Sequence, residues 1–321
     1  MAIFQRYSKN PILIPNKNNW WESKAVFNCS VSYDGKNVHM LYRAIGEYDN
    51  YISRIGYASS CDGFQFDRRH NIAICPTEDY EKHGMEDPRI TQIEDKIFVT
   101  YVVLSENVKK HPKIFSALAV TKNYDEFEKL GIITKDFDNN KDVIFFPEKF
   151  KIDGNFSNGS FLILHRPTTL SNPDYQISRP SIWLSISNSE LIISNSMLLL
   201  KPEQDWEHLK IGAGPSPIKT KKGWLLIYHG VSSDKIYRAG AALLDLNDPR
   251  KVIARTKKPL LEPVEDYEKI GDVNNVVFPT GTVIIDNKLL LYYGGADRVC
   301  CVASANIDEL IEHILKDSII A

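Results

Sequence analysis

Two adjacent carboxylates and a guanidinium stand in the segment Gly84 to Arg89, which reads Gly-Met-Glu-Asp-Pro-Arg. Pro88 fixes its own φ and biases the residue before it towards extended backbone, so we expect the carboxylate of Asp87 to be held rigidly. A general acid must be placed within reach of its substrate before its pKa matters, and Asp87 is therefore a candidate proton donor. The structural alternative is an ion pair between Asp87 and Arg89.

The composition excludes several classes of protein. The 321 residues carry a formal net charge of -2, and the charges are spread without a basic stripe or an acidic tail, so we expect no nucleic-acid partner. The apolar runs are too short to cross a membrane and the first residues begin no signal peptide, so we expect a cytoplasmic protein. Five cysteines without a Cys-x-x-Cys pair argue against a metal site and against a disulfide framework. Association into a homo-oligomer is compatible with the sequence, which carries no signal for or against it.

The elements that must position Asp87 follow an internal repeat. A short apolar strand with a polar or aromatic end occurs five times, and its last residues are Arg43, Val102, Arg166, His229 and Tyr293. The spacings are 59, 64, 63 and 64 residues. A second strand of small and apolar residues follows each one, and turn signals separate the strands. Each repeat therefore predicts a sheet of several strands.

An aromatic residue followed by Glu precedes four of the repeats. These glutamates are Glu22, Glu81, Glu207 and Glu268. Six residues past them stand Asn28, Asp87, Ala213 and Asn274. We expect these four positions to be equivalent, so that Asp87 has counterparts in other repeats.

Five sheets of about four strands each predict an all-β, five-bladed β-propeller, with a β-sandwich as the alternative. The sequence ends in a predicted helix with Asn306 as N-cap and Glu309 three residues later. Its apolar face is expected to comprise Ile307, Leu310, Ile311, Ile314 and Leu315. Because no Pro, Gly or Ser-rich linker divides the chain, we interpret residues 1–321 as a single domain.

In a propeller the innermost strands face a central channel, so equivalent polar residues of different blades converge there. The residues expected to converge are Asn28, Arg43, Asp87, Arg89, His165, Arg166, Lys210, His229, Tyr237, Arg238, Asp297 and Arg298. Such a funnel holds many cations and few carboxylates. Crowded cations repel one another unless an anion binds between them, and phosphate accepts hydrogen bonds from several Arg and Lys donors at once. The alternative is that each Arg pairs with a nearby acid on the surface.

Six segments carry a resemblance to a known family: Gly84 to Arg89, Leu164 to Pro167, Ile227 to Gly230, Tyr237 to Asp245, Val277 to Gly281 and Tyr293 to Arg298. In this order, over about residues 10 to 310, they resemble glycoside hydrolase family 130, the β-mannoside phosphorylases and their hydrolytic relatives. The resemblance implies a five-bladed propeller. It also implies reversible phosphorolysis of a β-linked mannosyl disaccharide or oligosaccharide with inversion, which yields α-mannose 1-phosphate and a shortened sugar.

The resemblance assigns roles to individual residues. It implies that Asp87 donates the proton, through the 3-hydroxyl of the transferred mannose, and that inorganic phosphate is the co-substrate, with no cofactor. Phosphate is already an anionic nucleophile, so the second carboxylate of an inverting hydrolase is dispensable. The implied phosphate ligands are Arg166, Lys210, His229, Tyr237 and Lys141. The implied sugar ligands are Asn28, Arg43, Arg54 and Asp297, with Phe278 as a wall on the acceptor side.

Other activities could use the same funnel. A β-mannosidase of the same family would use water, but such relatives lack the basic phosphate ligands that are present here. A mannosyltransferase using mannose 1-phosphate or GDP-mannose is left open by the sequence, whereas a sugar-binding propeller without turnover needs neither the acid nor the phosphate ligands. The linkage and the acceptor sugar also stay open. The loops expected to decide them are Glu47 to Ser53, Leu104 to Pro112 and Leu170 to Arg179.

Overall fold

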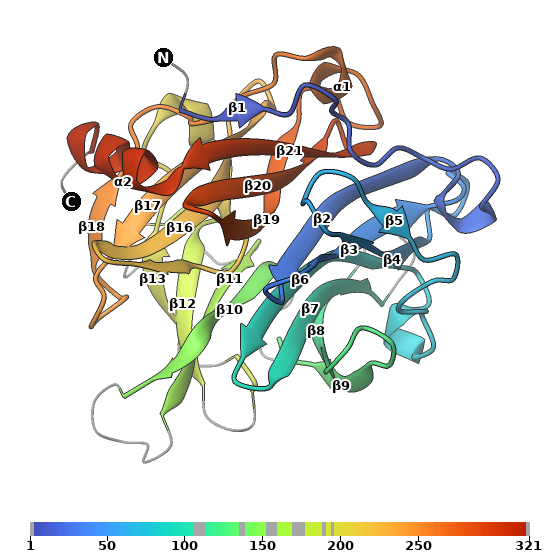
Figure 1. Cartoon of the computed structure of the whole chain (residues 1–321). Helices are drawn as coiled ribbons and strands as arrows, with labels where there is room; N and C mark the ends of the chain where they lie inside the picture. The colour runs from blue at the N-terminus through green and yellow to red at the C-terminus, as the bar shows by residue number, and fades with distance from the viewer. Residues whose placement is uncertain are drawn as a thin grey trace.

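The computed structural model describes residues 3–105, 113–134, 139–151, 159–168, 177–187, 191–193 and 196–318. Within this part of the chain, five antiparallel sheets surround a common axis, and a helix, α2 (Ile307–Lys316), follows the last of them (Figure 1). The predicted all-β, five-bladed propeller with a short C-terminal helix is confirmed. Two of the three loops expected to select the acceptor lie partly outside the described residues.

Each blade is a meander whose first strand is innermost. Blade 1 consists of β2 (Ala25–Tyr33), β3 (Val38–Ile45), β4 (Ser53–Ser60) and β5 (Asp67–Arg68). Blade 2 consists of β6 (Met85–Ile93), β7 (Lys96–Leu104), β8 (Ile114–Thr121) and β9 (Glu128–Ile132). Blade 3 consists of β10 (Asn140–Phe150), β11 (Ser160–Pro167), β12 (Ile182–Ser187) and β13 (Ser196–Leu200). Blade 4 consists of β14 (Lys210–Ala213), β15 (Ile218–Thr220), β16 (Gly223–Val231), β17 (Tyr237–Leu244) and β18 (Val252–Arg255). Blade 5 consists of β19 (Val277–Ile285), β20 (Lys288–Gly295), β21 (Val299–Asn306) and β1 (Gln5–Arg6).

The N-terminal strand completes the last blade. Gln5 of β1 pairs with Ser304 of β21, so the two ends of the chain meet in one sheet, as Figure 1 shows. Arg6 reinforces this junction, because its Nε donates to Glu268 Oε1 over 2.7 Å and its Nη2 donates to Glu268 Oε2 over 3.0 Å. The ring of blades is therefore closed by hydrogen bonds and by an ion pair between its first and last segments.

The glutamates of the aromatic–Glu repeat are buried and receive a tyrosine hydroxyl from the second strand of their own blade. The pairs are Tyr42 and Glu22 (2.7 Å), Tyr101 and Glu81 (2.9 Å), Tyr228 and Glu207 (3.0 Å), and Tyr293 and Glu268 (2.8 Å). An Arg or Lys also pairs with each carboxylate: Arg68, Lys129, Arg255 and Arg6. A buried carboxylate is tolerated only with such partners. The sequence repeat thus marks a structural clamp that fixes the segment leading into each blade.

These clamps correct two details of the predicted repeat. In blade 5 the tyrosine of the clamp is Tyr293, which corresponds to Tyr42 of blade 1 and Tyr101 of blade 2. The residue equivalent to Arg43 and Val102 is therefore Gly294, one position later than the spacing predicts. Asn274 is exposed and precedes β19, so it is not the counterpart of Asp87 in blade 5. The segment between the glutamate and the innermost strand is longer in that blade than in blades 1 and 2.

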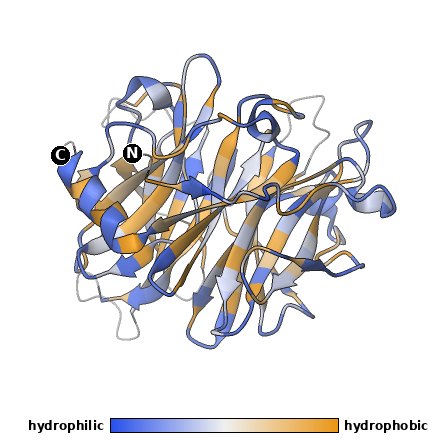
Figure 2. Ribbon diagram, turned by 45° about the horizontal axis from the view of Figure 1, so that its top comes forward, coloured by the Kyte–Doolittle hydropathy of each residue, from blue (hydrophilic) through white to orange (hydrophobic). Residues whose placement is uncertain are grey.

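The apolar core is divided among the interfaces between neighbouring blades. In one such cluster Leu41 and Ile55 of blade 1 pack with Val99 and Tyr101 of blade 2, and comparable clusters join the other neighbours around the ring. Figure 2 shows the hydrophobic residues concentrated on the strands and the hydrophilic ones on the connecting loops. Since every blade packs against two others, the inner ends of the sheets are held at fixed positions around the axis.

Helix α2 covers the outer part of blades 4 and 5. Asn306 caps it by accepting from the backbone N–H groups of Asp308 (3.0 Å) and Glu309 (3.1 Å), as predicted. The buried face comprises Ile307, Leu310, Ile311 and Ile314. Leu315, which was expected on this face, is 38% exposed, because its position on the helix turns it towards solvent.

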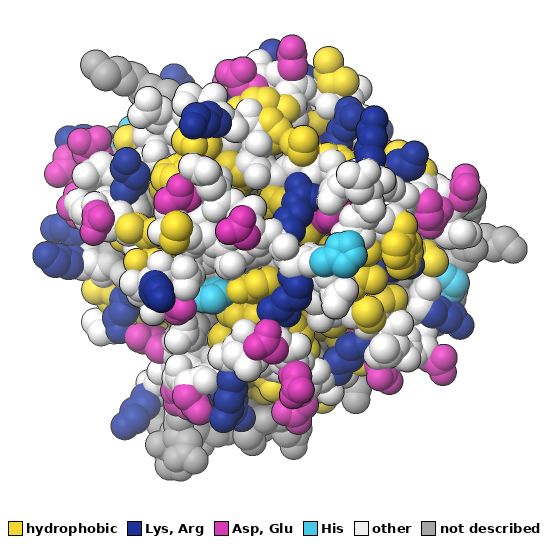
Figure 3. All heavy atoms as spheres, turned by 45° about the vertical axis from the view of Figure 1, so that its right-hand side comes forward, with side chains coloured by type: hydrophobic (Ala, Val, Ile, Leu, Met, Phe, Trp, Pro, Cys, Tyr) yellow, Lys and Arg dark blue, Asp and Glu magenta, His cyan; other side chains and the backbone are white. Residues whose placement is uncertain are grey.

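No helix in the described ranges is long and apolar enough to cross a membrane. On the face drawn in Figure 3, the Lys and Arg side chains are interspersed with Asp and Glu side chains.

Candidate active site

The innermost strands of the first three blades bulge at the same position. The pairing register shifts between Phe27 and Ser30 in β2, and equivalent shifts occur after Glu86 in β6 and after Lys141 in β10. The first bulged residue has positive φ in each case: Asn28 (49°), Asp87 (49°) and Asp142 (55°). A bulge redirects a side chain out of the regular alternation of a strand. The three side chains therefore come together near the axis.

This geometry confirms one expectation about Asp87 and corrects another. Asn28 and Asp87 are equivalent, as the repeat predicts. The backbone of Asp87 is left-handed, however, and not extended, because the bulge dominates over the preference imposed by Pro88. A non-glycine residue in this region is strained, and such strain persists where the surrounding structure enforces it.

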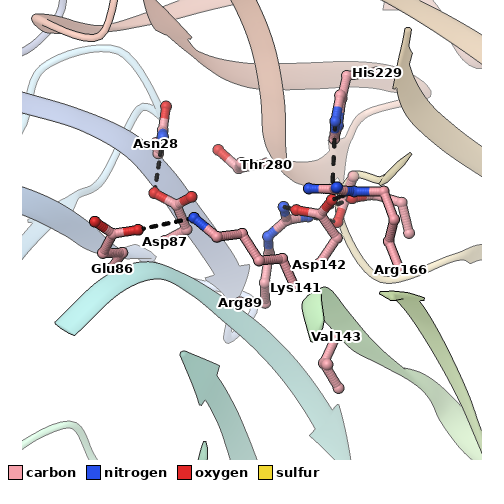
Figure 4. Close-up of polar contacts among 12 residues, drawn as sticks. Asn28, Glu86, Asp87, Arg89, Lys141, Asp142, Val143, Arg166, His229 and Thr280 are labelled. Carbon is pink, nitrogen blue, oxygen red and sulfur yellow. Dashed lines mark hydrogen bonds and ion pairs between the residues drawn. The ribbon is translucent and has the colours of Figure 1, made fainter. Parts of the chain in front are cut away.

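Asp87 is 8% exposed, and its Oδ1 atom is held from two sides. Asn28 donates to this oxygen through Nδ2 over 2.8 Å (Figure 4). Arg43 donates to it through Nη1 over 3.3 Å. Among the residues that the structure describes, no hydrogen bond ends on Oδ2. One carboxylate oxygen is thus fixed, and the other is available to a substrate.

Glu86, the neighbour of Asp87, is neutralised by two cations. Arg43 Nη2 donates to its Oε1 over 2.6 Å, and Lys141 Nζ lies 3.2 Å from its Oε2. Burial opposes the charged form of Glu86, but Arg43 and Lys141 together hold its pKa below the ordinary value. Arg43 therefore bridges both carboxylates of the motif, and Lys141 reaches the same cluster from blade 3.

Arg89 does not pair with Asp87, which was the structural alternative. It is 2% exposed, and its Nη2 donates to Oδ1 of Asp142 over 2.9 Å while Nη1 donates to the carbonyl oxygens of Ala213 and Gly214. These bonds tie blade 2 to blades 3 and 4. The Arg89 guanidinium thus joins neighbouring blades, and the hydrogen-bond partners of Asp87 are Asn28 and Arg43.

Asp142 is the centre of a second cluster, which the sequence analysis missed. Its Oδ2 accepts from Arg166 Nε over 2.6 Å and lies 3.8 Å from His229 Nε2. Burial alone would raise the pKa of Asp142, but Arg166, His229 and Arg89 hold it well below the ordinary value. Figure 4 shows Arg89 and Arg166 directed at this carboxylate from two sides. No aromatic–Glu pair was found before blade 3, so counting from such a pair could not find Asp142. The strand ends of the repeat could have found it, because Lys141 pairs with Arg166 as Glu86 pairs with Val102, and Asp142 is the next residue as Asp87 is.

The remaining predicted phosphate ligands surround Arg166. Lys210 Nζ lies 5.0 Å from the centre of the Tyr237 ring. Burial, assisted by the charge of Arg166, lowers the pKa of Lys210 to about 8. The His229 ring stands 4.5 Å from that of Phe278, and burial lowers the pKa of His229 well below its ordinary value.

Two groups in the site have unused hydrogen-bonding capacity. Both ring nitrogens of His229 are buried without a hydrogen-bond partner among the described residues, and the same holds for Oδ1 of Asn28. An unpaired buried polar atom costs free energy, and such atoms at a functional site are explained by a ligand that completes them. The neutral imidazole can donate one hydrogen bond to an anion, and the Asn28 oxygen can accept one from a sugar hydroxyl.

Asp297 also reaches this region, from the turn between β20 and β21, where its φ is 49°. Burial raises the pKa of Asp297 to about 7; the charge of Arg43 opposes the rise, and the nearby Asp87 adds to it. Asp297 can therefore exchange a proton near neutral pH, and in either state it can hydrogen-bond a sugar hydroxyl.

Four of the expected residues lie elsewhere. Arg54 stacks over the ring of Trp20 at 4.7 Å and donates to the carbonyl of Ile52, so its predicted contact with sugar stays a prediction. His165 lies within blade 3, 2.9 Å from Asn140 and 2.7 Å from Ser196. Arg238 pairs with Glu262, and Arg298 is exposed beyond Asp297. His165 and Arg238 each sit one position away from a residue that does converge, Arg166 and Tyr237, and successive residues of a strand point to opposite faces.

Gly212 of β14 is required by the close packing around Asp142. An added Cβ would lie 2.2 Å from Asp142 Oδ2 and 2.4 Å from His229 Cε1. We expect Gly212→Ala to lower kcat/KM for phosphate by on the order of a hundredfold, because it displaces groups that must be positioned within about 1 Å. Phosphate kinetics and thermal unfolding of the variant measure this. In Gly35→Ala the added Cβ meets no atom within 4 Å, but the φ of +91° strains an alanine there, so this control should lose some stability and keep the phosphate KM. Equal effects of the two variants on phosphate kinetics would contradict the packing argument.

This chain is similar to known proteins over nearly its whole length. A family model described as beta-1,4-mannooligosaccharide phosphorylase matches residues 3–316. A 1,2-beta-oligomannan phosphorylase of Thermoanaerobacter sp. (strain X514) is 39% identical over 97% of this chain and 99% of its own length. A beta-1,4-mannooligosaccharide phosphorylase of Ruminococcus albus is 29% identical over 98% of this chain and 92% of its own length. The structure of beta-1,2-mannobiose phosphorylase from Listeria innocua in complex with beta-1,2-mannobiose superposes with a TM-score of 0.84 at 30% identity, covering 97% of this chain and 99% of that one. The chain belongs to glycoside hydrolase family 130.

Proposed function

We propose that this protein is an inverting β-mannoside phosphorylase, with inorganic phosphate as co-substrate and without a cofactor. The observation that carries the proposal is the arrangement of one available acid, Asp87, opposite a buried cationic cluster. That cluster contains the imidazole of His229, whose nitrogens have no hydrogen-bond partner in the part of the chain that the structure describes. Arg166 and Lys210 complete the cluster. Phosphate satisfies such donors together, since its oxygens accept several charge-assisted hydrogen bonds.

In the proposed reaction, a phosphate oxygen attacks the anomeric carbon of the mannosyl unit as the bond from that carbon to the leaving oxygen breaks. Asp87 supplies the proton that the leaving oxygen takes up, directly or through the 3-hydroxyl of the mannose. The product is α-mannose 1-phosphate, because attack from the opposite face inverts the β-configuration. Asn28 and Arg43 orient the acid by holding its Oδ1.

The site favours phosphate over water as the nucleophile. An inverting hydrolase needs a second carboxylate that is free to activate water. Glu86 is held by Arg43 and Lys141, and Asp142 accepts from Arg89 and Arg166. Cations that pair with a carboxylate lower its basicity. These two carboxylates are therefore poor bases, whereas the cations around them suit an anion. Asp297, the third carboxylate, interacts with Arg43 and Asp87, and it therefore belongs to the side of the acid and not to the cationic cluster.

The comparisons favour a β-1,2-linked substrate. The relatives named for β-1,2 linkages are 36 to 39% identical to this chain, whereas the one named for β-1,4-mannooligosaccharides is 29% identical. We therefore propose β-1,2-linked mannosides as the substrate class. We also propose a cytoplasmic location, which is supported by the five cysteines, all of which are free thiols in the structure.

Product analysis tests the proposed function. The protein is incubated with β-1,2-mannobiose and, separately, with β-1,4-mannobiose, each with and without inorganic phosphate. Mannose 1-phosphate that forms only with phosphate is the expected result, and the better disaccharide identifies the linkage. Free mannose in both tubes would instead identify a β-mannosidase. If neither disaccharide reacts but GDP-mannose serves as a donor, the protein is a mannosyltransferase.

Lys210 gives the proposed reaction a pH dependence. Its pKa of about 8 means that it is charged at neutral pH and loses its proton as the pH rises through 8. We expect KM for phosphate to increase about tenfold between pH 7 and pH 9, while kcat at saturating phosphate changes little. Initial rates over a phosphate series at each pH measure both. Lys210→Arg should abolish the increase, because a guanidinium stays protonated in this range. An equally steep increase in that variant would show that another group titrates.

A further inference from the structure

Blade 5 contacts the bulge of blade 1 through Thr280, a residue that has no role in the function proposed so far. The pairing register of β19 with β20 shifts between Pro279 and Gly281, so Thr280 lies in a bulge of its own. Thr280 is fully buried, and its Oγ1 donates to the carbonyl oxygen of Cys29 over 2.7 Å. Figure 4 shows this hydroxyl directed towards Asn28. Thr280 therefore reaches the backbone of blade 1 one residue after Asn28.

The neighbouring strand of blade 5, β20, supports the same bulge at Gly294. A Cβ added to Gly294 would lie 2.2 Å from Asn28 Oδ1 and 3.0 Å from the Asn28 backbone nitrogen. The backbone of blade 5 is thus packed directly against Asn28, and only a glycine permits so close an approach. Blade 5 therefore holds the bulge by a hydrogen bond from Thr280 and by direct contact at Gly294.

The opposite side of this bulge faces blade 2 and the acid. Asn28 Nδ2 donates to Asp87 Oδ1 over 2.8 Å, and Ser30 Oγ accepts from the backbone N–H of Ile90 over 2.9 Å. The segment from Asn28 to Ser30 therefore lies between blade 5 and the strand β6, which carries Asp87. A displacement of this segment would move the amide that fixes the acid.

The bulge needs such support because its backbone is strained. Asn28 has a φ of 49°, a value that a residue other than glycine keeps only where its surroundings enforce it. A bulge also interrupts the ladder of hydrogen bonds between strands, and a buried carbonyl group without a partner costs free energy. The Thr280 hydroxyl supplies a partner to the Cys29 carbonyl. Without this hydroxyl, we expect the bulge to relax and the Asn28 amide to leave its position.

We propose that Thr280 is a positioning residue for the acid, because its hydroxyl fixes the bulge from which Asn28 holds Asp87. The inference rests on the proposed phosphorylase function and adds to it a residue of blade 5. Thr280 is not a catalytic residue, since a fully buried side chain does not touch the substrate. It acts through the Cys29 backbone and the Asn28 amide.

Thr280→Val tests this role, because it removes the hydroxyl and keeps the branched shape of the side chain. We expect kcat on the mannobiose that the wild type prefers to fall on the order of tenfold. The effect is smaller than that of removing the acid, because Arg43 still holds Asp87. An aryl β-mannoside whose leaving group needs no proton should lose much less activity. The phosphate KM should not change, since the proposed phosphate ligands belong to blades 3 and 4.

Two further variants test the same contact in other ways. Thr280→Ser restores the hydroxyl and should recover most of the kcat on mannobiose. Gly294→Ala displaces Asn28 by direct contact and should lose more activity on mannobiose than on the aryl substrate, as Thr280→Val does. This second variant keeps the proposal testable if Thr280→Val does not fold.

Thr91→Val is the matched control. Thr91 is also buried on an innermost strand, and it donates to a carbonyl oxygen of the neighbouring blade, that of Phe145, over 3.3 Å. Because Phe145 does not adjoin Asn28, the control should lose some stability but keep the wild-type ratio of activities on mannobiose and on the aryl mannoside. Equal losses on both substrates in Thr280→Val, or the same change of ratio in Thr91→Val, would overturn the proposal.

Crystal structures of Thr280→Val and Thr280→Ser test the geometry without turnover. The distance from Asn28 Nδ2 to Asp87 Oδ1 should exceed hydrogen-bond length in Thr280→Val and be retained in Thr280→Ser. An unchanged distance in Thr280→Val overturns this proposal, even where mannobiose phosphorolysis upholds the function. A wild type that forms no mannose 1-phosphate overturns the proposed function instead, while a displaced Asn28 would still uphold the contact by which Thr280 positions Asp87.

Discussion

Asp87→Asn should lower kcat for mannoside phosphorolysis by about a hundredfold or more, which is the usual contribution of a general acid. The amide has the shape of the carboxylate, and its oxygen can still accept from Asn28 and Arg43. The loss should therefore come from the missing proton and not from a rearranged site. Thermal unfolding should show a folded variant, and initial rates with saturating phosphate measure the loss.

A substrate with an activated leaving group distinguishes a proton donor from a residue that only shapes the site. An aryl β-mannoside whose phenolate leaves without protonation needs no acid. Asp87→Asn should therefore lose far less activity on the aryl substrate than on the disaccharide. An equal loss on both substrates would remove Asp87 from the role of proton donor.

Asp142→Ala should lower the free energy of unfolding by about 3–5 kcal/mol, because it leaves the buried guanidinium groups of Arg89 and Arg166 without their carboxylate. Urea unfolding of the wild type and the variant measures the difference. Asp125→Ala is the matched control, since Asp125 pairs with Arg69 over 2.8 Å but is 65% exposed in its side chain. An exposed pair of this kind contributes at most about 1 kcal/mol. Similar losses in the two variants would contradict the central role assigned to Asp142.

The contribution of Asp142 should also depend on pH. Its pKa in the folded protein lies below the ordinary value, so the folded state favours the ionised form. This stabilisation is present above the pKa of the unfolded chain, about 3.9, and is lost as the pH falls below it. The difference in stability between the wild type and Asp142→Asn should accordingly shrink in acid.

The repeat allowed the fold to be predicted from the sequence, because each blade carries the same physical signals. An apolar strand, a turn and a buried Glu that requires a Tyr hydroxyl recur, and the clamp from Tyr101 to Glu81 shows why that spacing is kept. The count failed in blade 5, where the segment after Glu268 is longer and Asn274 is exposed. A spacing argument holds only while the segments between the marked residues keep their length.

The site was predicted less completely because it depends on backbone details that composition does not encode. Tyr237 lies beside His229 and Lys210, whereas the next residue, Arg238, pairs with Glu262. A difference of one position along the strand therefore decides whether a side chain faces the funnel or the surface. Asp142 was missed although it is the counterpart of Asp87, since its blade lacks the motif used for counting. The positive φ at both bulges is set by pairing with the neighbouring strand, which the sequence does not reveal.

The pairing of Gln5 with Ser304 bears on how the protein is made. Domains begin to fold from their N-terminus during synthesis, but Ser304, the partner of Gln5 in the first strand, is translated about three hundred residues later. That strand must wait, with its backbone groups exposed, until about three hundred later residues have emerged. Early blades can pack against one another on the ribosome, but the ring can close only after β21 has emerged. A product truncated before β21 would expose two unpaired sheet edges, a state that invites aggregation.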